Sequence, residues 1–351
     1  MDASFIYFDT SAIGLTSREL NEKGNQFSNE LAQQGSVRTA KWQTEDAPRI
    51  KNRLAQFLGS KTSELAFIPN FSFGLSTFLF SLPKDFIVAF LPFDYLSITL
   101  PFDLMGFKRT IIATKDENWP NDDEIIVGLK ASKPAIFVAS HVQYQSGFKM
   151  DYKKIGQFCQ ENDILFILDA TQSLGYEKYD FSEGFIDVLI SSHYKWMNAG
   201  AGTGSMCIKE SILKKYTPKI GGYQSYEIVN NELIYHAGIR SYEPGHVNMR
   251  GLIELEQAII EKEEEIKQNC LNHQMELVKY FLQKAKEHHF EIIGGFEMNN
   301  RSPIVCIWDE EGILHKKLKS ANIICTHRNK RIRFGFSPKN TREEIDLIFS
   351  V

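Results

Sequence analysis

The sequence is poor in cysteine, and its few cysteines form no recognisable pattern. There are five in 351 residues, an odd number, and no two of them have the spacing of zinc ligands. A disulfide framework and a metal site are therefore not predicted. Reduced thiols are the economical interpretation, and they predict a cytoplasmic protein.

A strong net charge and long apolar runs are also missing. The formal net charge is −4, so there is no electrostatic case for nucleic acid or an anionic membrane as a partner. The N-terminal stretch contains no basic segment followed by an apolar one, so neither a signal peptide nor a membrane-spanning helix is expected. No internal repeat is present. The absence of a G-x-G-x-x-G after an early strand argues against a dinucleotide-binding fold.

Short apolar runs alternate with helical patterns along the chain. Runs at residues 86–90, 135–139 and 164–168 are apolar throughout, which is typical of strands buried on both faces. A further short strand is predicted at residues 4–9. Strands of this kind, alternating with helices, predict an α/β protein with a mainly parallel sheet flanked by helices.

The length allows one large domain and a smaller one. We predict an N-terminal segment at residues 1–15, a large domain at 16–248 and a smaller α+β C-terminal domain at 249–351. The small domain would begin with one long connecting helix that runs to about residue 288. The stretch around Trp42 is predicted to be a loop.

A polar, glycine-rich stretch surrounds Lys195, between two short predicted strands. Ser192, His193 and Tyr194 offer hydrogen-bond donors to an anion, and the glycines that follow allow a ligand to approach the backbone closely. A lysine partly desolvated among such donors loses its charge easily and becomes a nucleophilic amine. Lysine, phosphate donors and glycine turns are together what a pyridoxal phosphate site requires. A solvated lysine in a polar loop is the alternative.

The apolar run at residues 164–168 is closed by Asp169. A carboxylate at the carboxyl end of a buried parallel strand points into the crevice where α/β sheets bind ligands. Asp169 would pair there with a protonated pyridine nitrogen, and Gln172 would reach the ring hydroxyl. The alternative is that Asp169 only caps a following helix.

These two stretches resemble a known family. LDATQSLG at residues 168–175 and SSHYKWMNAGAGTG at 191–204 resemble the aspartate and lysine motifs of the class V aminotransferase family, the cysteine-desulfurase-like branch of fold-type I pyridoxal phosphate enzymes. The lysine loop is most similar to those of kynureninases and isopenicillin-epimerase-like members. The similarity runs almost end to end, from IYFDTSAIG to RFGFSPKNTREEID.

The resemblance implies a fold-type I homodimer with pyridoxal 5'-phosphate held as a Schiff base on Lys195. The substrate would be an amino acid or a related amine, and Lys195 and Asp169 would be catalytic. Transamination, a kynureninase-like lyase or epimerase reaction and cysteine desulfuration stay open, as does a catalytically idle homologue that only binds the cofactor.

Further cofactor residues are assigned from the same resemblance. A strand, a polar turn and a helix start create an anion site, because the first N–H groups of a helix have no intrahelical partner. The family binds the cofactor phosphate at such a turn, and here it contains Asn70, Phe71 and Ser72. Tyr95 falls where members stack an aromatic or histidine ring on the pyridine, with a core tyrosine as the alternative. Gln143 and Tyr144 fall where members contact the cofactor hydroxyl or the substrate.

The C-terminal half completes the implied site. Arg333 falls on the arginine that pairs with the substrate carboxylate, and its planar fork suits that group. Arg328 and Arg331 are expected to be solvated. Where members usually have a Gly-Thr pair that reaches the partner subunit's phosphate, this chain has a Gly-His pair. Its His246 can still donate to phosphate.

The interval that carries the nucleophilic cysteine of desulfurases, residues 326–331, contains no cysteine. Cys325 lies just before it in an apolar run, where a thiol is more often buried and inert than reactive. Chemistry through a persulfide on a protein cysteine is therefore not expected.

Overall fold

The computed structural model describes residues 5–115, 120–236 and 238–351. Its largest sheet has seven strands in the order β2-β8-β7-β6-β5-β3-β4. Neighbouring strands from β7 to β4 are parallel, whereas β8 is antiparallel to both β7 and β2. The strands are β2 Leu65–Ile68, β3 Ile87–Phe90, β4 Lys108–Ile111, β5 Ile136–Ser140, β6 Leu165–Asp169, β7 Val188–Ser192 and β8 Gly204–Ile208. The prediction of a mainly parallel α/β sheet is confirmed.

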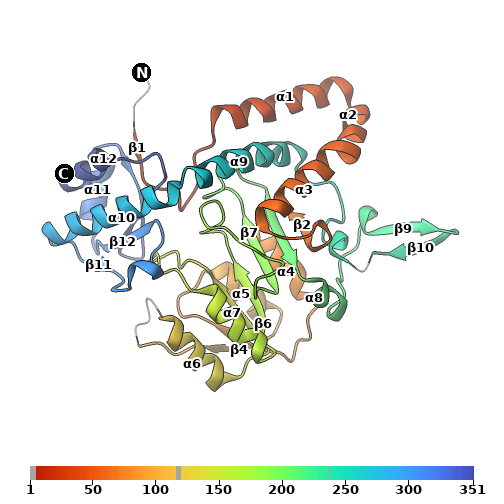
Figure 1. Ribbon diagram of the computed structural model, residues 1–351, viewed down its shortest axis with the longest axis horizontal. Coiled ribbons are helices and arrows are strands. Elements are labelled where there is room, and N and C mark those ends of the chain that lie inside the picture. Colours follow the sequence, from red (N-terminus) through yellow and green to blue (C-terminus); the bar gives the residue numbers. More distant parts are fainter. Residues whose placement is uncertain (1–4, 116–119, 237) are drawn as a thin grey trace.

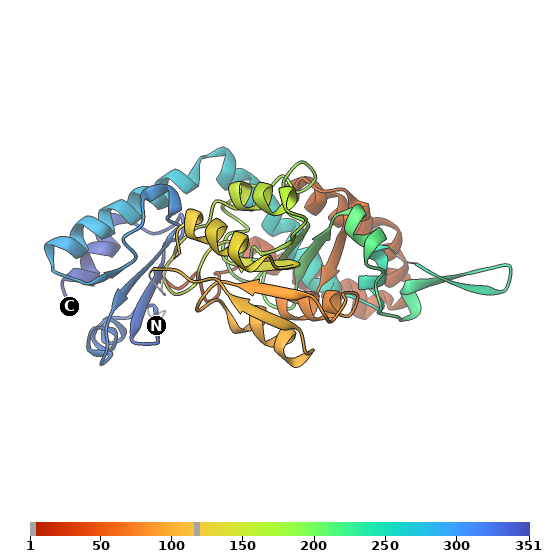
Figure 2. The same cartoon turned by 90° about the horizontal axis from the view of Figure 1, so that it is seen from below.

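Helices cover both faces of this sheet (Figures 1 and 2). One apolar core joins a face of the sheet to residues of α1, α3, α6, α7 and α9, and a second core joins the other face to α4, α5 and α8. Every residue of β5, β6, β7 and β8 is buried, which explains their continuous apolar runs. The helices are α1 Arg18–Gln34, α3 Ala47–Leu58, α4 Phe71–Leu79, α5 Leu96–Leu104, α6 Asp122–Ser132, α7 Tyr152–Glu161, α8 Glu210–Lys215 and α9 Met249–Lys267.

A smaller antiparallel sheet lies beside the first, in the order β11-β12-β15-β14. Its strands are β11 Ile292–Ile293, β12 Ile304–Trp308, β14 Thr326–Arg328 and β15 Arg331–Gly335, and it packs with α10 Cys270–Glu287, α11 Ile313–Ser320 and α12 Arg342–Phe349. The N-terminal strand β1 Ile6–Tyr7 pairs in parallel with β13 Ile323–Ile324. Strand β1 therefore lies against the C-terminal layer (Figure 1). The division into domains at residue 249 stays a prediction.

The carboxyl ends of the parallel strands meet at one edge of the large sheet. Ser140 at the end of β5 is in register with Asp169 at the end of β6. The strand β2 is antiparallel to β8, which is antiparallel to β7. The turn at Asn70 after β2 therefore reaches the same edge as Ser192 at the end of β7. Topology alone gathers the predicted residues here.

Two predictions about helices are wrong. The long helix from residue 249 is two helices, because Asn269 between α9 and α10 has a φ of 56°, a left-handed conformation that asparagine tolerates and a continuous helix does not allow. The stretch at Trp42 is not a loop but a π-helical turn, Trp42–Asp46, between α2 Ser36–Lys41 and α3. Trp42 is buried against Phe27.

Three further observations complete the description. Ser4, which opens the predicted first strand, lies outside the described residues, and the strand begins at Ile6. A hairpin of β9 Tyr226–Val229 and β10 Glu232–Tyr235 projects from the body of the molecule (Figure 1). In the described part of the chain, every helix falls short of the length and apolar character needed to cross a membrane.

Candidate active site

A cavity of about 310 Å³ lies at the carboxyl edge of the large sheet. Ten of the residues predicted for the site line it: Asn70, Phe71, Ser72, Tyr95, Tyr144, Asp169, Gln172, Ser192, Tyr194 and Lys195. Ser140 and Thr171 also line it and were missed. The sequence could have indicated both residues, because each stands at or just after the end of a predicted parallel strand. Such positions lie together at one edge of the sheet.

Lys195 presents the amine of the cavity. Its Nζ lies 5.7 Å from the centre of the Tyr95 ring and 5.8 Å from that of the Tyr194 ring. Burial lowers the pKa of Lys195 to about 8, against the raising effect of the Asp169 carboxylate, and the nearby charge of Arg333 lowers it further. The amine therefore loses its proton at a pH where an ordinary lysine keeps it.

The loop that carries Lys195 is held from two sides. Trp196 donates its indole N–H to Gln172 Oε1 at 2.9 Å, and Gln172 Nε2 donates to the Ser11 carbonyl at 3.0 Å. The amide of Gln172, predicted to reach a cofactor hydroxyl, is thus used to brace the loop. Gly175 has a φ of 121°, and a Cβ there would lie 2.3 Å from the Trp196 carbonyl oxygen. Only glycine allows this close approach.

Asp169 is the buried acid of the cavity. It accepts a hydrogen bond from the Thr171 N–H at 2.8 Å. Burial raises the pKa of Asp169, while its hydrogen bonds to Thr171 and the positive charge of Lys195 oppose that rise. A cation placed against this carboxyl group favours its ionised form.

The turn before α4 forms the other end of the cavity. Asn70 caps the helix by accepting from the Phe73 N–H, and the Phe71 N–H donates to Ser192 Oγ at 2.8 Å. The Ser192 N–H in turn donates to Thr171 Oγ1 at 3.1 Å. This network sets hydroxyl groups beside the start of a helix, an arrangement that binds anions. Lys195 is the one cation among the described residues that line the cavity.

A second buried carboxylate fixes the wall opposite Lys195. Asp94 accepts from the N–H of Tyr95 at 2.7 Å, and from the N–H and the hydroxyl of Ser140 at 2.9 and 2.6 Å. Burial raises the pKa of Asp94. Tyr95 packs edge-on against Tyr144, with ring centres 5.3 Å apart. The position of the Tyr95 ring is thereby set from both sides.

The structure does not bring His193 or Gln143 to the cavity wall. His193 is fully buried with its Nε2 2.9 Å from Ser205 Oγ, and burial lowers its pKa to about 3, so the ring is neutral. Gln143 accepts from the backbone of Gln145 and Ser146 and donates to the Phe93 carbonyl. His193 is turned towards strand β8 and Gln143 towards the backbone of its own loop, and spacing along the sequence cannot reveal these directions.

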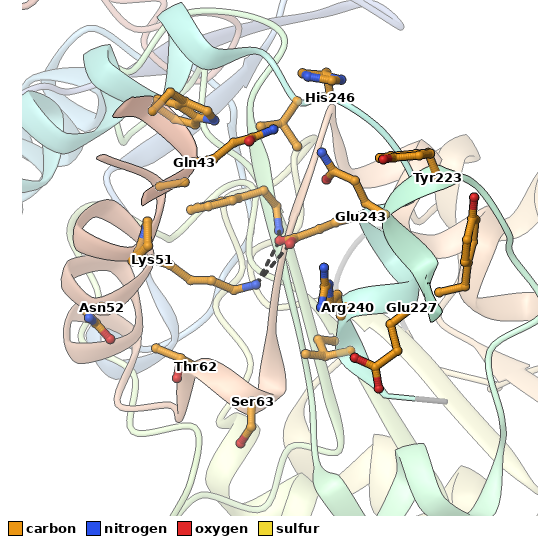
Figure 3. Close-up of a pocket in the computed structure, with 18 of the residues that line it drawn as sticks. Gln43, Lys51, Asn52, Thr62, Ser63, Tyr223, Glu227, Arg240, Glu243 and His246 are labelled. Carbon is orange, nitrogen blue, oxygen red and sulfur yellow. Dashed lines mark hydrogen bonds and ion pairs between the residues drawn. The ribbon is translucent and has the colours of Figure 1, made fainter. Parts of the chain in front are cut away.

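His246 lines a different and larger cavity, of about 990 Å³ (Figure 3). Gln43, Lys51, Arg240 and Glu243 are also part of its wall, and Lys51 is paired with Glu243 at 3.0 Å. Within this chain, His246 is therefore not one of the residues that the structure gathers around Lys195.

Arg333 lies next to the Lys195 cavity, in a narrow recess that shares Tyr144 with it. It donates to the Tyr144 carbonyl at 3.4 Å and to Thr326 Oγ1 at 3.3 Å, and its guanidinium lies 3.7 Å from the Asp9 carboxylate. The expectation of a solvated Arg331 is wrong, because Arg331 is half-buried over the Trp308 ring at 4.6 Å. Arg328 is exposed, as expected.

The low pKa of Lys195 generates a prediction. In protein freed of any bound small molecule, acylation of Lys195 should reach half its maximal rate near pH 8, against an ordinary lysine value of 10.5. Asp169→Asn should move this midpoint to lower pH, because the carboxylate favours the protonated amine. Peptide mapping after brief acylation measures the midpoint, with exposed lysines as the internal reference. A midpoint that rises in Asp169→Asn would contradict the assignment.

Known proteins resemble this chain in sequence and in structure. A cysteine desulfurase described as probable, from Borreliella burgdorferi, is 26% identical over 246 residues, which are 64% of this chain and 58% of that protein. A kynureninase from Burkholderia mallei is 22% identical over 229 residues, 58% of this chain and 51% of that protein. The chain thus matches little more than half the length of these curated relatives.

Solved structures match over nearly the whole chain. An apo cysteine desulfurase from Thermococcus onnurineus superimposes with a TM-score of 0.87 at 20% identity, covering 99% of this chain and 93% of that one. The cystine C-S lyase C-DES gives a TM-score of 0.87 at 17% identity, covering 99% and 97%. These likenesses confirm the fold. The family model for class-V aminotransferases matches residues 6–348, and this protein belongs to that family.

Proposed function

We propose that this protein is a pyridoxal 5'-phosphate-dependent enzyme that acts on an amino acid or a related amine. The observation that carries the proposal is the pairing, in one cavity, of a lysine that loses its proton easily with the buried carboxylate of Asp169. A purely structural lysine has no need of either feature.

The residues that line the cavity match the chemical groups of this cofactor one by one. The start of α4, with Ser72 and Ser192, offers N–H and hydroxyl donors for its phosphate. Asp169 offers an anion for its protonated ring nitrogen, and Tyr95 an aromatic face for its ring. Lys195 Nζ would hold its aldehyde carbon covalently. When bound, pyridoxal phosphate withdraws electrons from the α-carbon of the amine joined to it.

The catalytic roles follow from charge and position. With its proton already weakly held, Lys195 can bind the cofactor and, once displaced by substrate, accept or donate a proton at the substrate α-carbon. Asp169, ionised beside a cation, keeps the proton on the ring nitrogen. Arg333 is the proposed partner of the substrate carboxylate. Its buried Nε has no hydrogen-bond partner among the residues that the structure describes, so it can donate to that group.

Exposed apolar surface supports a homodimer. The β9–β10 hairpin leaves Ile228 67% and Leu233 71% exposed, and a lone two-stranded hairpin is marginal in water. On α5, Leu96, Leu100 and Leu104 form an exposed apolar row with spacing i, i+4, i+8. A second copy would cover such surface. His246 from that copy would add a donor to a phosphate site where Lys195 is the one cation among the described lining residues.

Two finer points remain proposals. All five cysteines are free, which is in keeping with a reducing compartment, and we propose the cytoplasm. Burial raises the pKa of all five thiols, that of Cys325 to about 12. None is poised as a thiolate, which disfavours a persulfide-forming desulfurase. Transamination is the leading reaction, and a lyase or epimerase reaction of the kynureninase-like kind is the alternative.

Covalent labelling tests the proposed function. The protein incubated with pyridoxal phosphate should turn yellow, and borohydride should fix the cofactor on the peptide that contains Lys195. Asp169→Asn should keep the label but lose at least about a hundredfold in turnover of an amino acid, because the ring nitrogen loses its counter-charge. A label on another lysine, or normal turnover in Asp169→Asn, would refute these roles. Cofactor binding without turnover of any amine would indicate an idle homologue.

The proposed dimer is tested by charging the hairpin. Leu233→Asp should shift the protein towards monomer in sedimentation, because a charge would be buried in the interface. The control is Val127→Asp, at a similarly exposed apolar position on α6 (65%), and it should leave the protein a dimer. His246→Ala should weaken cofactor binding by about tenfold through the lost hydrogen bond to phosphate. A monomer with full cofactor occupancy would contradict the shared site.

The inert thiol generates a separate prediction. Cys325→Ser should leave activity towards every amino acid substrate unchanged within about twofold, because a buried neutral thiol supplies no nucleophile. Mass spectrometry after incubation with cysteine should find no persulfide on the protein. Sulfide release that vanished in Cys325→Ser would instead make the protein a desulfurase.

A further inference from the structure

Asp9 lies beside Arg333, the proposed partner of the substrate carboxylate. Thr326 Oγ1 donates to Asp9 Oδ1 at 2.7 Å, and the same carboxylate oxygen is 3.7 Å from Arg333 Nη2. Arg333 Nη2 also donates to Thr326 Oγ1, at 3.3 Å. The hydroxyl of Thr326 therefore forms a hydrogen bond with the acid and another with the guanidinium.

The carboxylate of Asp9 is held more firmly than the guanidinium of Arg333. The backbone of Asp9 forms a parallel bridge with Gly335, and its hydrogen bond from Thr326 is short. Arg333 donates to the Tyr144 carbonyl at 3.4 Å, and this distance, like those to its two other partners above, exceeds the roughly 2.9 Å of an ordinary N–H···O hydrogen bond. The guanidinium can therefore turn to another carboxylate while Asp9 stays bound to Thr326.

Burial explains why Arg333 has an acidic neighbour before substrate binds. The side chains of Arg333 and Asp9 are only 12% and 15% exposed. A buried guanidinium without a counter-charge is costly in free energy. Burial raises the pKa of Asp9, and Thr326 and Arg333 oppose that rise. If Arg333 turned away, the protonated form of Asp9 would therefore be favoured.

Other ionisable groups around Asp9 come from neighbouring elements. Burial and the charge of Asp9 raise the pKa of Tyr7 on β1 to about 12, and burial raises that of Cys325, after β13, to about 12. Both are thus neutral near neutral pH. His315 on α11 favours the ionised form of Asp9 when it is itself protonated. Arg333 differs from these groups in being positively charged at every working pH.

The pair of Asp9 and Arg333 lies close to the amine of the site. The charge of Arg333 lowers the pKa of Lys195, and that of Asp9 raises it. Tyr144, whose carbonyl accepts from Arg333, lines the Lys195 cavity. The carboxylate of an amine held at Lys195 would therefore meet Arg333 and Asp9 together.

We propose that Asp9 is a displaceable counter-ion, which the substrate carboxylate replaces on Arg333. The inference rests on the proposed function and adds a residue that sets the selectivity of the site for carboxylates. An incoming carboxylate gains only the difference between its own contacts and those that Asp9 loses. Asp9 is then a like-charged neighbour of the bound acid, so it takes up a proton.

A simple acid tests this exchange apart from amine chemistry. Calorimetry on the cofactor-loaded protein at about pH 8 should show butyrate binding about tenfold more tightly to Asp9→Asn than to the wild type, because asparagine keeps an acceptor for Thr326 but offers Arg333 no charge. The affinity for butyramide, which is neutral, should change less than about twofold. Unchanged or weaker binding of butyrate in Asp9→Asn would overturn the inference, since that result is expected of a residue that only positions Arg333.

The matched control removes a different carboxylate from the same part of the molecule. Glu310 is exposed and paired with Lys330. Glu310→Gln loses the same unit of charge as Asp9→Asn and should bind butyrate as the wild type does. Equal tightening in both variants would show an effect of net charge alone and would overturn the inference.

Proton uptake gives a second measurement, which decides the question even if Asp9→Asn does not fold. Titration of the wild type with butyrate near pH 6, in buffers of different ionisation enthalpy, should show protons taken up on binding. The affinity should fall as the pH rises from the pKa of Asp9 in the free protein, which lies above 3.8, to its higher pKa in the complex. Protons taken up by the bound cofactor are measured separately from its absorption. Uptake that the cofactor accounts for entirely would overturn the inference.

The same titrations separate this inference from the proposed function. If the protein takes up no pyridoxal phosphate, the proposed enzyme is refuted and the role of Asp9 falls with it. If the cofactor binds but neither the wild type nor Asp9→Asn binds butyrate, Arg333 is not the carboxylate partner. The counter-ion is then refuted while the enzyme class stands.

Discussion

The site depends on one electrostatic arrangement, an amine and a carboxylate that share a largely desolvated edge of a sheet. Burial disfavours the charge on each, and each favours the charge on the other. As a result, Lys195 loses its proton easily, and the ionisation of Asp169 depends on a neighbouring cation. Helices on both faces of the sheet create the desolvation, because they enclose the strands in apolar side chains up to the polar strand ends.

The surroundings of this pair are arranged to keep it in place. Gly175 lets the lysine loop approach the strand-end turn, and Gln172 ties that loop to the N-terminal segment. On the other side, Asp94 binds Tyr95 and Ser140 together. A buried carboxylate that accepts several hydrogen bonds rigidifies its surroundings, because breaking any of these bonds would leave a buried charge partly unpaired at a high cost in free energy. The cavity is therefore a set of fixed groups, which is the condition for orienting a reacting amine.

Sequence reasoning was strongest where periodicity and topology act together. Strand runs that are apolar throughout and end in polar residues predicted the parallel sheet, and through it the gathering of residues from Asn70 to Lys195. It does not reach side-chain direction, since His193 turns towards Ser205 of strand β8 and Gln143 towards the backbone of its own loop. It failed at Asn269, where a single left-handed residue divides a pattern that is helical on both sides. The direction of a side chain and the φ angle of a single residue depend on tertiary contacts, which the spacing of residues along the sequence does not describe.

The pairing of β1 with β13 constrains how the chain is made. Ile6 leaves the ribosome long before its partner Ile323, which lies in the C-terminal layer. Phe8 likewise packs on Phe334 and Phe336. Non-local contacts of this kind form late, so the first strand must wait, unpaired and apolar, while the large sheet folds during synthesis. Since Ser11 and Gly14 hydrogen-bond the residues around the lysine loop, the site is completed only after β13 has been synthesised.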